Sequence, residues 1–142
     1  MRLLFVKHSL VWPRSSGHDV HTFYMMKACA ALGHDVSLAT VVEPEGHALD
    51  GLVLASRHRL NGLPASATAP GTRLQKRFRS FWGITEEQIE SLRRVVATER
   101  PDAVVVVGLD ALPYFPALTG TTRVWYAADE WVLHHLSQVQ QI

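Results

Sequence analysis

The amino-acid sequence predicts an α/β fold, a Rossmann-like three-layer sandwich with a mostly parallel sheet, in one domain over residues 1–142. Short continuous apolar runs, typical of strands covered on both faces, alternate along the chain with longer stretches of helical periodicity. A chain of 142 residues is long enough to bury one hydrophobic core of its own. Parallel strands joined in this way need right-handed crossovers, so we expect helices on both faces of the sheet.

The first 42 residues predict a βαβ unit. Residues 3–6 (LLFV) form a short apolar strand, and residues 12–17 (WPRSSG) contain the breakers of a loop. A helix is expected over residues 18–32, followed by Gly33 where a left-handed residue would end it. Residues 36–42 then form a second strand, parallel to the first. The side chains expected on the inner face of the helix are Val20, Phe23, Tyr24, Met26, Ala30 and Ala31.

The middle of the chain has weaker strand signals and one well-marked helix. Residues 52–54 (LVL) predict a short strand, and a helix is expected over residues 73–82. Thr85 and Gln88 have the spacing of a capping box, which begins the next helix, and Pro101 ends that helix.

The last third of the chain continues the alternation. Residues 103–107 (AVVVV) predict a buried strand, and residues 111–118 predict a short helix interrupted by two prolines. Residues 123–127 form the last expected strand, and a further helix begins over residues 131–142.

The composition excludes several classes of protein. The formal net charge is +1, which gives no indication of a nucleic acid partner. No apolar run approaches the roughly 18 residues of a membrane-spanning helix, and the N-terminal apolar run is too short for a signal peptide. Cys29 is the only cysteine, so no disulfide can form within the chain, and its apolar neighbours predict a packing role. We therefore expect a cytoplasmic protein.

Three well-known motifs are absent from the sequence. It has no GxGxxG after the first strand, no GxxxxGK[ST] and no GxSxG, which argues against a dehydrogenase, a P-loop nucleotidase and an α/β-hydrolase. The pairs His18/His21 and His134/His135 lack partners at zinc-ligand spacing, so we expect no metal site.

The fold itself predicts where a ligand would bind. In open parallel sheets, ligands bind outside the carboxyl ends of the strands. The loops at those ends follow Lys7, Thr40, Val107 and Ala127.

Four segments of the chain carry a resemblance to a known family. They are the opening strand MRLLFV, the loop WPRSSG, the helix end AALGHDV at residues 30–36, and RPDAVVVV at residues 100–107. In order and spacing they resemble the N-terminal domain of GT-B glycosyltransferases, especially the large, mostly retaining family that uses nucleotide-sugar donors. Residues 124–131 (VWYAADEW) lie where many members have a strand followed by His-Asp. Here Ala128 replaces that histidine, and His18 replaces the second of two adjacent loop glycines.

The resemblance implies a glycosyltransferase of the hexosyltransferase type, acting in carbohydrate biosynthesis. Residues 1–142 would be its acceptor-side domain, and a C-terminal domain that holds the nucleotide-diphosphate sugar would lie outside this chain. The implied partners are that C-terminal domain and a sugar acceptor, which can be lipid-linked or a cell-surface glycan precursor. The donor is a substrate, so no permanently bound cofactor is implied. We expect residues 1–142 alone to be inactive.

The same resemblance places Gly17 and its neighbours Ser16 and His18 in the site. A glycine here lets the backbone approach the donor phosphates or the reacting sugar, and the start of the following helix adds a favourable dipole. The alternative is that Gly17 only makes a turn.

Five further residues are candidates for contact with the substrates. Asp129 is the candidate catalytic residue, because a carboxylate at this edge can take the proton of the acceptor hydroxyl or position the acceptor. Its alternative role is an N-cap for the last helix, and Glu130 is a second candidate. Gly108 and Asp110 follow the valine strand, where Asp110 either contacts ligand or, as the favoured interpretation, caps the short helix after it. His8 follows the first strand, as an acceptor contact or as an ordinary loop histidine.

Residues 51–85 contain six basic and no acidic residues, which raises the question of membrane contact. A basic amphipathic helix can lie on an anionic membrane surface, here the inner face of the membrane. The favoured alternative is a helix that packs its apolar face on the sheet and keeps its charges in water. The residues that would contact the membrane are Arg73, Lys76, Arg77, Phe78, Arg79 and Trp82.

Two other functions stay open. One is a stand-alone α/β binding or regulatory module, and the other is half of a sugar-nucleotide epimerase, which can share the two-domain plan. A flavodoxin-like receiver would need clustered acidic residues after its first strand, where this sequence has Lys7, His8 and Ser9.

Overall fold

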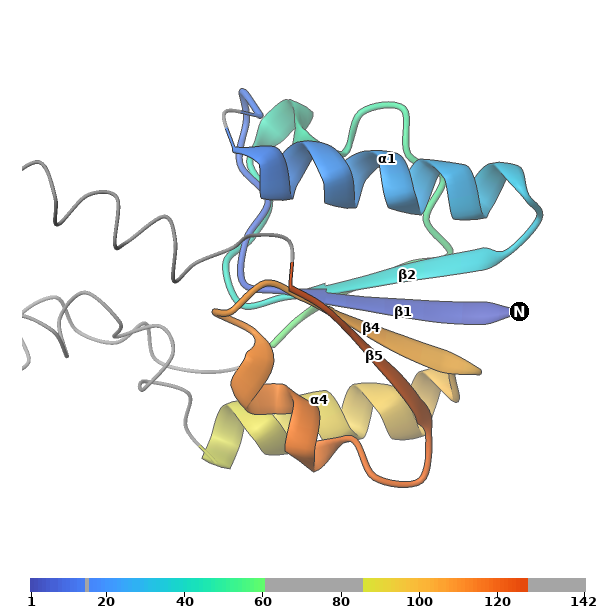
Figure 1. Cartoon of the computed structure of the whole chain (residues 1–142), viewed down its shortest axis with the longest axis vertical. Helices are drawn as coiled ribbons and strands as arrows, with labels where there is room; N and C mark the ends of the chain where they lie inside the picture. The colour runs from blue at the N-terminus through green and yellow to red at the C-terminus, as the bar shows by residue number, and fades with distance from the viewer. Residues whose placement is uncertain (15, 61–85, 128–142) are drawn as a thin grey trace, which may run out of the picture.

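The structure, a computed structural model, describes residues 1–14, 16–60 and 86–127. These residues form a five-stranded sheet in which every strand pairs in parallel with its neighbours, in the order β3-β2-β1-β4-β5 (Figure 1). The prediction of an α/β sandwich with a mostly parallel sheet is confirmed. The strands are β1 (Arg2–Lys7), β2 (Asp35–Thr40), β3 (Ser56–Arg59), β4 (Ala103–Val107) and β5 (Thr122–Tyr126).

Helices cover both faces of the sheet, which gives the three layers. In Figure 1, α1 (Gly17–Ala31) and the 3-10 helix η1 (Gly46–Leu49) lie on one face, and α4 (Glu86–Glu99) and the 3-10 helix η2 (Leu112–Ala117) lie on the other. Neighbouring strand residues point to opposite faces, so β1 supplies both cores. Phe5 packs in the α1-side core, whereas Leu4 and Val6 pack in the α4-side core.

The inner face of α1 is more polar than the sequence predicts. Phe23 and Met26 are buried as expected, but Tyr24 is exposed, and Asp19 and Thr22 are buried beside them. Positions 19, 22, 23 and 26 have the spacing of one helical face, so the geometry of the helix brings a carboxylate into the interior. Gly33 follows the helix with a φ of 86°, which confirms it as the left-handed residue at the helix end.

The strand predicted over residues 52–54 is wrong, because the edge strand β3 is Ser56–Arg59. Leu52 and Leu54 are half-buried and pack against the α1-side core without joining the sheet. Charged side chains on an edge strand discourage pairing with other chains, which explains why β3 carries no apolar run.

The other sequence-based boundaries are close to the observed ones. The helix that Pro101 was expected to end is α4, which ends at Glu99, and the short helix expected over residues 111–118 is η2. Cys29 is partly buried against the α1-side core, which agrees with a packing role. The helices expected over residues 73–82 and 131–142, and the cap at Thr85, lie outside the described residues.

A hydrogen-bonded cluster joins the end of α4 to the β3 edge. Ser56 Oγ donates to Glu99 Oε1 at 2.6 Å, and His58 Nε2 lies 2.6 Å from the same oxygen. The hydrogen bond from Ser56 is the main reason that the pKa of the Glu99 carboxyl lies below its ordinary value. Both Ser56 and Glu99 meet the same nitrogen of His58, whereas a catalytic triad needs the two different nitrogens of the imidazole, so this cluster is structural.

Replacing Glu99 should weaken the fold in a pH-dependent way. A carboxyl whose pKa is lowered by folding stabilises the native state above its unfolded pKa, and this contribution is lost as pH falls through the folded pKa. We therefore expect Glu99→Gln to lower the free energy of unfolding at pH 7 by about 1–2 kcal/mol, from its charge-assisted hydrogen bonds. The deficit should shrink as pH falls below the ordinary carboxyl value of 4.5. Urea denaturation at several pH values measures it.

The matched control is Glu90→Gln, because Glu90 is half-exposed on the same helix and, among the described residues, makes only long ion pairs with Arg93 and Arg94. It should change stability by less than about 0.5 kcal/mol. Equal effects of the two substitutions, or a Glu99→Gln deficit that does not depend on pH, would contradict this account.

Candidate functional site

An open pocket of about 190 Å³ lies where β1 and β4 end and α1 begins. The strand order reverses between β1 and β4, so the pocket occupies the topological switch point at which open α/β sheets bind ligands. The pocket brings together five of the residues predicted from the sequence, His8, Ser16, His18, Gly108 and Asp110. Its other lining residues are Lys7, Ser9, Asp19, Val107 and Leu109.

The floor of the pocket is a buried ion pair that the sequence analysis missed. Lys7 Nζ lies 2.9 Å from Asp19 Oδ1, and the two side chains are 11% and 6% exposed. Lys7 Nζ also donates to the carbonyl oxygen of Ser9 at 2.8 Å. Ser16 Oγ donates to Asp19 Oδ2 at 3.0 Å and accepts the backbone N–H of Asp19 at 3.2 Å as the N-cap of α1. The pair therefore connects the end of β1, the following loop and the start of α1.

His8 presents a partly desolvated imidazole to the pocket. Its carbonyl oxygen accepts the backbone N–H groups of Val41 and Val42 at 3.1 and 3.0 Å, which fixes its backbone beside the end of β2. Burial lowers the pKa of the imidazole below its ordinary value of 6.5, and the nearby ammonium of Lys7 lowers it further, while the carboxylate of Asp110 raises it. His8 is therefore neutral at pH 7 and can accept a proton.

Asp110 does not cap the short helix, which corrects the interpretation favoured from the sequence. The N-cap of η2 is Ala111, and no side chain makes a capping hydrogen bond there. Asp110 instead lines the pocket, close enough to His8 for its charge to act on the imidazole. A carboxylate in this place stabilises the imidazolium that forms when His8 takes a proton.

Gly108 forms the wall of the pocket on the β4 side. Its φ is 84°, a left-handed conformation, and an added Cβ would lie 3.5 Å from Nδ1 of His18. Its N–H donates to the carbonyl oxygen of Tyr126 at 2.9 Å, and its own carbonyl oxygen accepts Nε1–H of Trp125 at 3.0 Å. The end of β5 therefore holds the loop after β4 in place.

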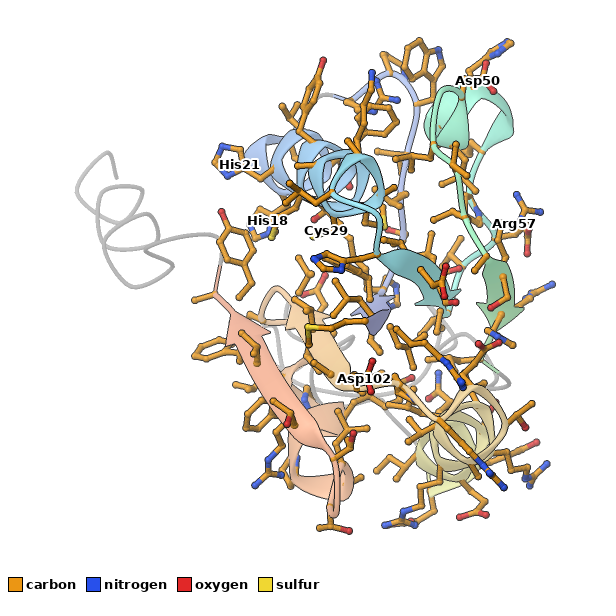
Figure 2. All side chains as sticks on the ribbon, turned by 90° about the vertical axis from the view of Figure 1, so that its right-hand side faces the viewer. His18, His21, Cys29, Asp50, Arg57 and Asp102 are labelled. Carbon is orange, nitrogen blue, oxygen red and sulfur yellow. The ribbon has the colours of Figure 1, made fainter. Side chains whose placement is uncertain are left out.

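One turn along α1 from His18, which lines the pocket, the helix contacts the end of β5. Nδ1 of His21 lies 2.9 Å from the hydroxyl oxygen of Tyr126. Figure 2 shows His18 and His21 together on the side of α1 that faces β5. Gly17, in contrast, is the exposed first residue of α1, has no positive φ and would have nothing within 4 Å of an added Cβ. The structure therefore gives no steric reason for a glycine at this position.

The other predicted site residues lie outside the described residues. These are the candidate catalytic residue Asp129, its neighbour Glu130, and the possible membrane-contact residues Arg73, Lys76, Arg77, Phe78, Arg79 and Trp82. Within residues 1–14, 16–60 and 86–127, no three His, Cys, Asp or Glu side chains gather closely enough to hold a metal ion. In the same ranges, no helix combines the length and the apolar character needed to cross a membrane.

Solved structures share this fold at low sequence identity. TcCGT1 in complex with UDP matches with a TM-score of 0.62 and 15% identity, over 99% of this chain and 31% of its own. The glycosyltransferase of kitacinnamycin matches with a TM-score of 0.61 and 16% identity, over 99% of this chain and 35% of its own. SnogD, a glycosyltransferase from Streptomyces nogalater, matches with a TM-score of 0.55 and 21% identity, over 99% of this chain and 38% of its own.

These likenesses define the class of fold. The chain is a Rossmann-like domain of the kind found in GT-B glycosyltransferase structures, and it spans about a third of the length of the proteins it matches. No protein-family model matches the sequence, and no curated protein matches it.

The pairing of His8 with Asp110 can be tested without a substrate. We expect the His8 imidazole to titrate below 6.5, and Asp110→Asn to lower its pKa further because the carboxylate that raises it is gone. Carbon–proton correlation spectra recorded against pH measure both values. Asp35→Asn removes an exposed carboxylate at the opposite end of the sheet and should leave the His8 pKa unchanged. An unchanged His8 pKa in Asp110→Asn would show that the two groups do not interact.

Proposed function

We propose that this chain is the acceptor-binding half of a glycosyltransferase, which transfers a sugar from a nucleoside-diphosphate sugar to an acceptor hydroxyl, with His8 as the general base. The observation that carries the proposal is a neutral, partly desolvated imidazole beside a carboxylate at the switch point of the sheet. Two of the three similar structures are named as glycosyltransferases and the third is a complex with UDP, the kind of nucleotide such a donor releases.

The proposed reaction needs one proton acceptor on this chain. The acceptor oxygen attacks the anomeric carbon of the donor sugar, the bond from that carbon to the diphosphate breaks, and the nucleoside diphosphate leaves with the electron pair. His8 takes the hydroxyl proton, and Asp110 stabilises the resulting imidazolium. A base that acts on the acceptor fits a direct displacement with inversion at the sugar carbon, although the sequence resembles a mostly retaining family.

The proposal changes the role given to Asp129 and places the donor site outside these residues. His8 performs the proton transfer for which the sequence analysis chose Asp129, so Asp129 keeps the role of positioning the acceptor in this proposal. The donor sugar would be held by a C-terminal domain outside these residues, which agrees with the chain spanning only 31–38% of the similar structures. Action in carbohydrate biosynthesis, a cytoplasmic location and peripheral membrane contact through residues 73–82 rest on the sequence alone.

The activity of the complete enzyme should depend on His8. His8→Ala removes the general base, and we expect kcat to fall by roughly 10²–10⁴-fold, as general-base catalysis typically contributes. Release of nucleoside diphosphate in the presence of acceptor measures the rate.

The matched control is His47→Ala, because His47 also has a carboxylate neighbour, Asp50 at 2.7 Å, but both side chains are exposed and lie outside the pocket. It should keep kcat within about twofold, as surface substitutions away from a site generally do little. Equal activity of His8→Ala and His47→Ala would rule out His8 as the base.

A further inference from the structure

A second pocket, of about 260 Å³, lies at the same edge of the sheet as the first. It is formed by the ends of β2 and β3 and by the loop after β2. The strand register pairs Lys7 with Thr40 and Thr40 with Arg59, so these residues form one row across β1, β2 and β3. Neighbouring strands lie about 4.8 Å apart, so the backbone of Arg59 is roughly 10 Å from the backbone of Lys7. Lys7 forms part of the floor of the first pocket.

Thr40 brings an unpaired hydroxyl to this second pocket. The residue is only 2% exposed and lines the pocket, and its backbone carbonyl oxygen accepts the N–H of Leu60 at 2.8 Å. Its side chain makes no hydrogen bond with any other residue of the described chain. Thr40 Oγ1 is not one of the fully buried atoms that lack a partner, so the hydroxyl is accessible from the pocket and can donate a hydrogen bond to a ligand there.

Two arginines and one carboxylate, that of Glu43, line the pocket and leave it with a net positive charge. Arg57 and Arg59 are two residues apart on β3 and therefore lie on the same face of the sheet. Arg59 is exposed, and its side chain makes no ion pair within the part of the chain that the structure describes. Arg57 makes one long contact of 3.4 Å with Glu43, and both side chains are 55% exposed. Such surface pairs are weak, and a guanidinium has five N–H donors, so Arg57 keeps donors for a ligand.

We propose that this pocket binds an anionic group, a carboxylate or a phosphate, of the acceptor. Arg59 supplies two parallel N–H donors to the anion, Arg57 adds a further donor, and Thr40 donates its hydroxyl. The inference rests on the proposed function and narrows its substrate class, because the acceptor then carries a negative charge in the second pocket while its reacting hydroxyl lies in the first. A neutral sugar or an apolar aglycone would not neutralise the positive charge of the two arginines.

The experiment titrates the isotopically labelled 142-residue chain with inorganic phosphate and, separately, with acetate. Sodium chloride keeps the ionic strength constant, because screening alone shifts signals near charged side chains. We expect saturable shifts of the backbone amides of Thr40, Arg57 and Arg59 with at least one anion. Shifts with phosphate alone identify a phosphate-bearing acceptor, and shifts with acetate identify a carboxylate-bearing one.

Three variants locate the binding. Arg59→Gln should raise the dissociation constant at least about fivefold, because it removes the charge-assisted pair. Thr40→Val should raise it about twofold or more without unfolding the chain, since the lost hydroxyl has no partner within the described protein. Arg94→Gln is the control, because Arg94 is 67% exposed on α4, away from this pocket, and it should bind as the unsubstituted chain does.

The absence of saturable shifts with both anions, or an unchanged dissociation constant in Arg59→Gln, overturns the proposal. This binding needs no sugar transfer, so its failure is distinct from failure of the proposed function. If anions bind and Arg59→Gln weakens their binding, but His8→Ala keeps full activity, the anion subsite is supported and the role of His8 as base is ruled out. If His8→Ala loses activity but no anion binds, the role of His8 is supported and the anion subsite is ruled out.

Discussion

Lys7 and Asp19 form a buried ion pair that ties the last residue of β1 to the first turn of α1. Ser9 and Ser16 complete the network, so the loop between strand and helix is held from both ends. Removing one partner would leave an uncompensated buried charge, which typically costs about 3–5 kcal/mol. This network positions the lining residues that come from β1, the following loop and α1, and His8 directly follows Lys7 in the chain.

The exclusion of water that makes the pairing of Lys7 with Asp19 necessary also lowers the pKa of the His8 imidazole. Desolvation keeps the imidazole neutral, Lys7 acts in the same direction, and Asp110 acts against both. The loop that carries Asp110 is fixed by Gly108, whose backbone is held by Tyr126 and Trp125. In the proposed function, one end of the sheet thus positions the base and its carboxylate at the ends of β1 and β4 and the anion subsite at the ends of β2 and β3.

The sequence predicts the elements of the fold better than the chemistry of the site. Apolar runs such as residues 103–107 identify the central strands because both faces are buried, whereas β3 escapes prediction because an edge strand tolerates charged side chains. The loops of the site were predictable from topology alone. Asp19 was not, because an acidic residue in the first turn of a helix normally faces solvent and only the packing of α1 buries it. The sequence also favours a capping role for Asp110, since Asp before a helix usually signals a cap, whereas the structure places Asp110 in the lining of the pocket.

The most direct test of the central claim, that this domain supplies the acceptor site and the base while another domain holds the donor, is a crystal structure of the complete enzyme with a nucleoside diphosphate. The account predicts that the diphosphate is bound mainly by residues outside 1–142, with its phosphates facing His8 across a cleft. A nucleotide bound within the pocket between β1 and β4, with its diphosphate at Lys7 and His18, would contradict the assignment of this domain to the acceptor.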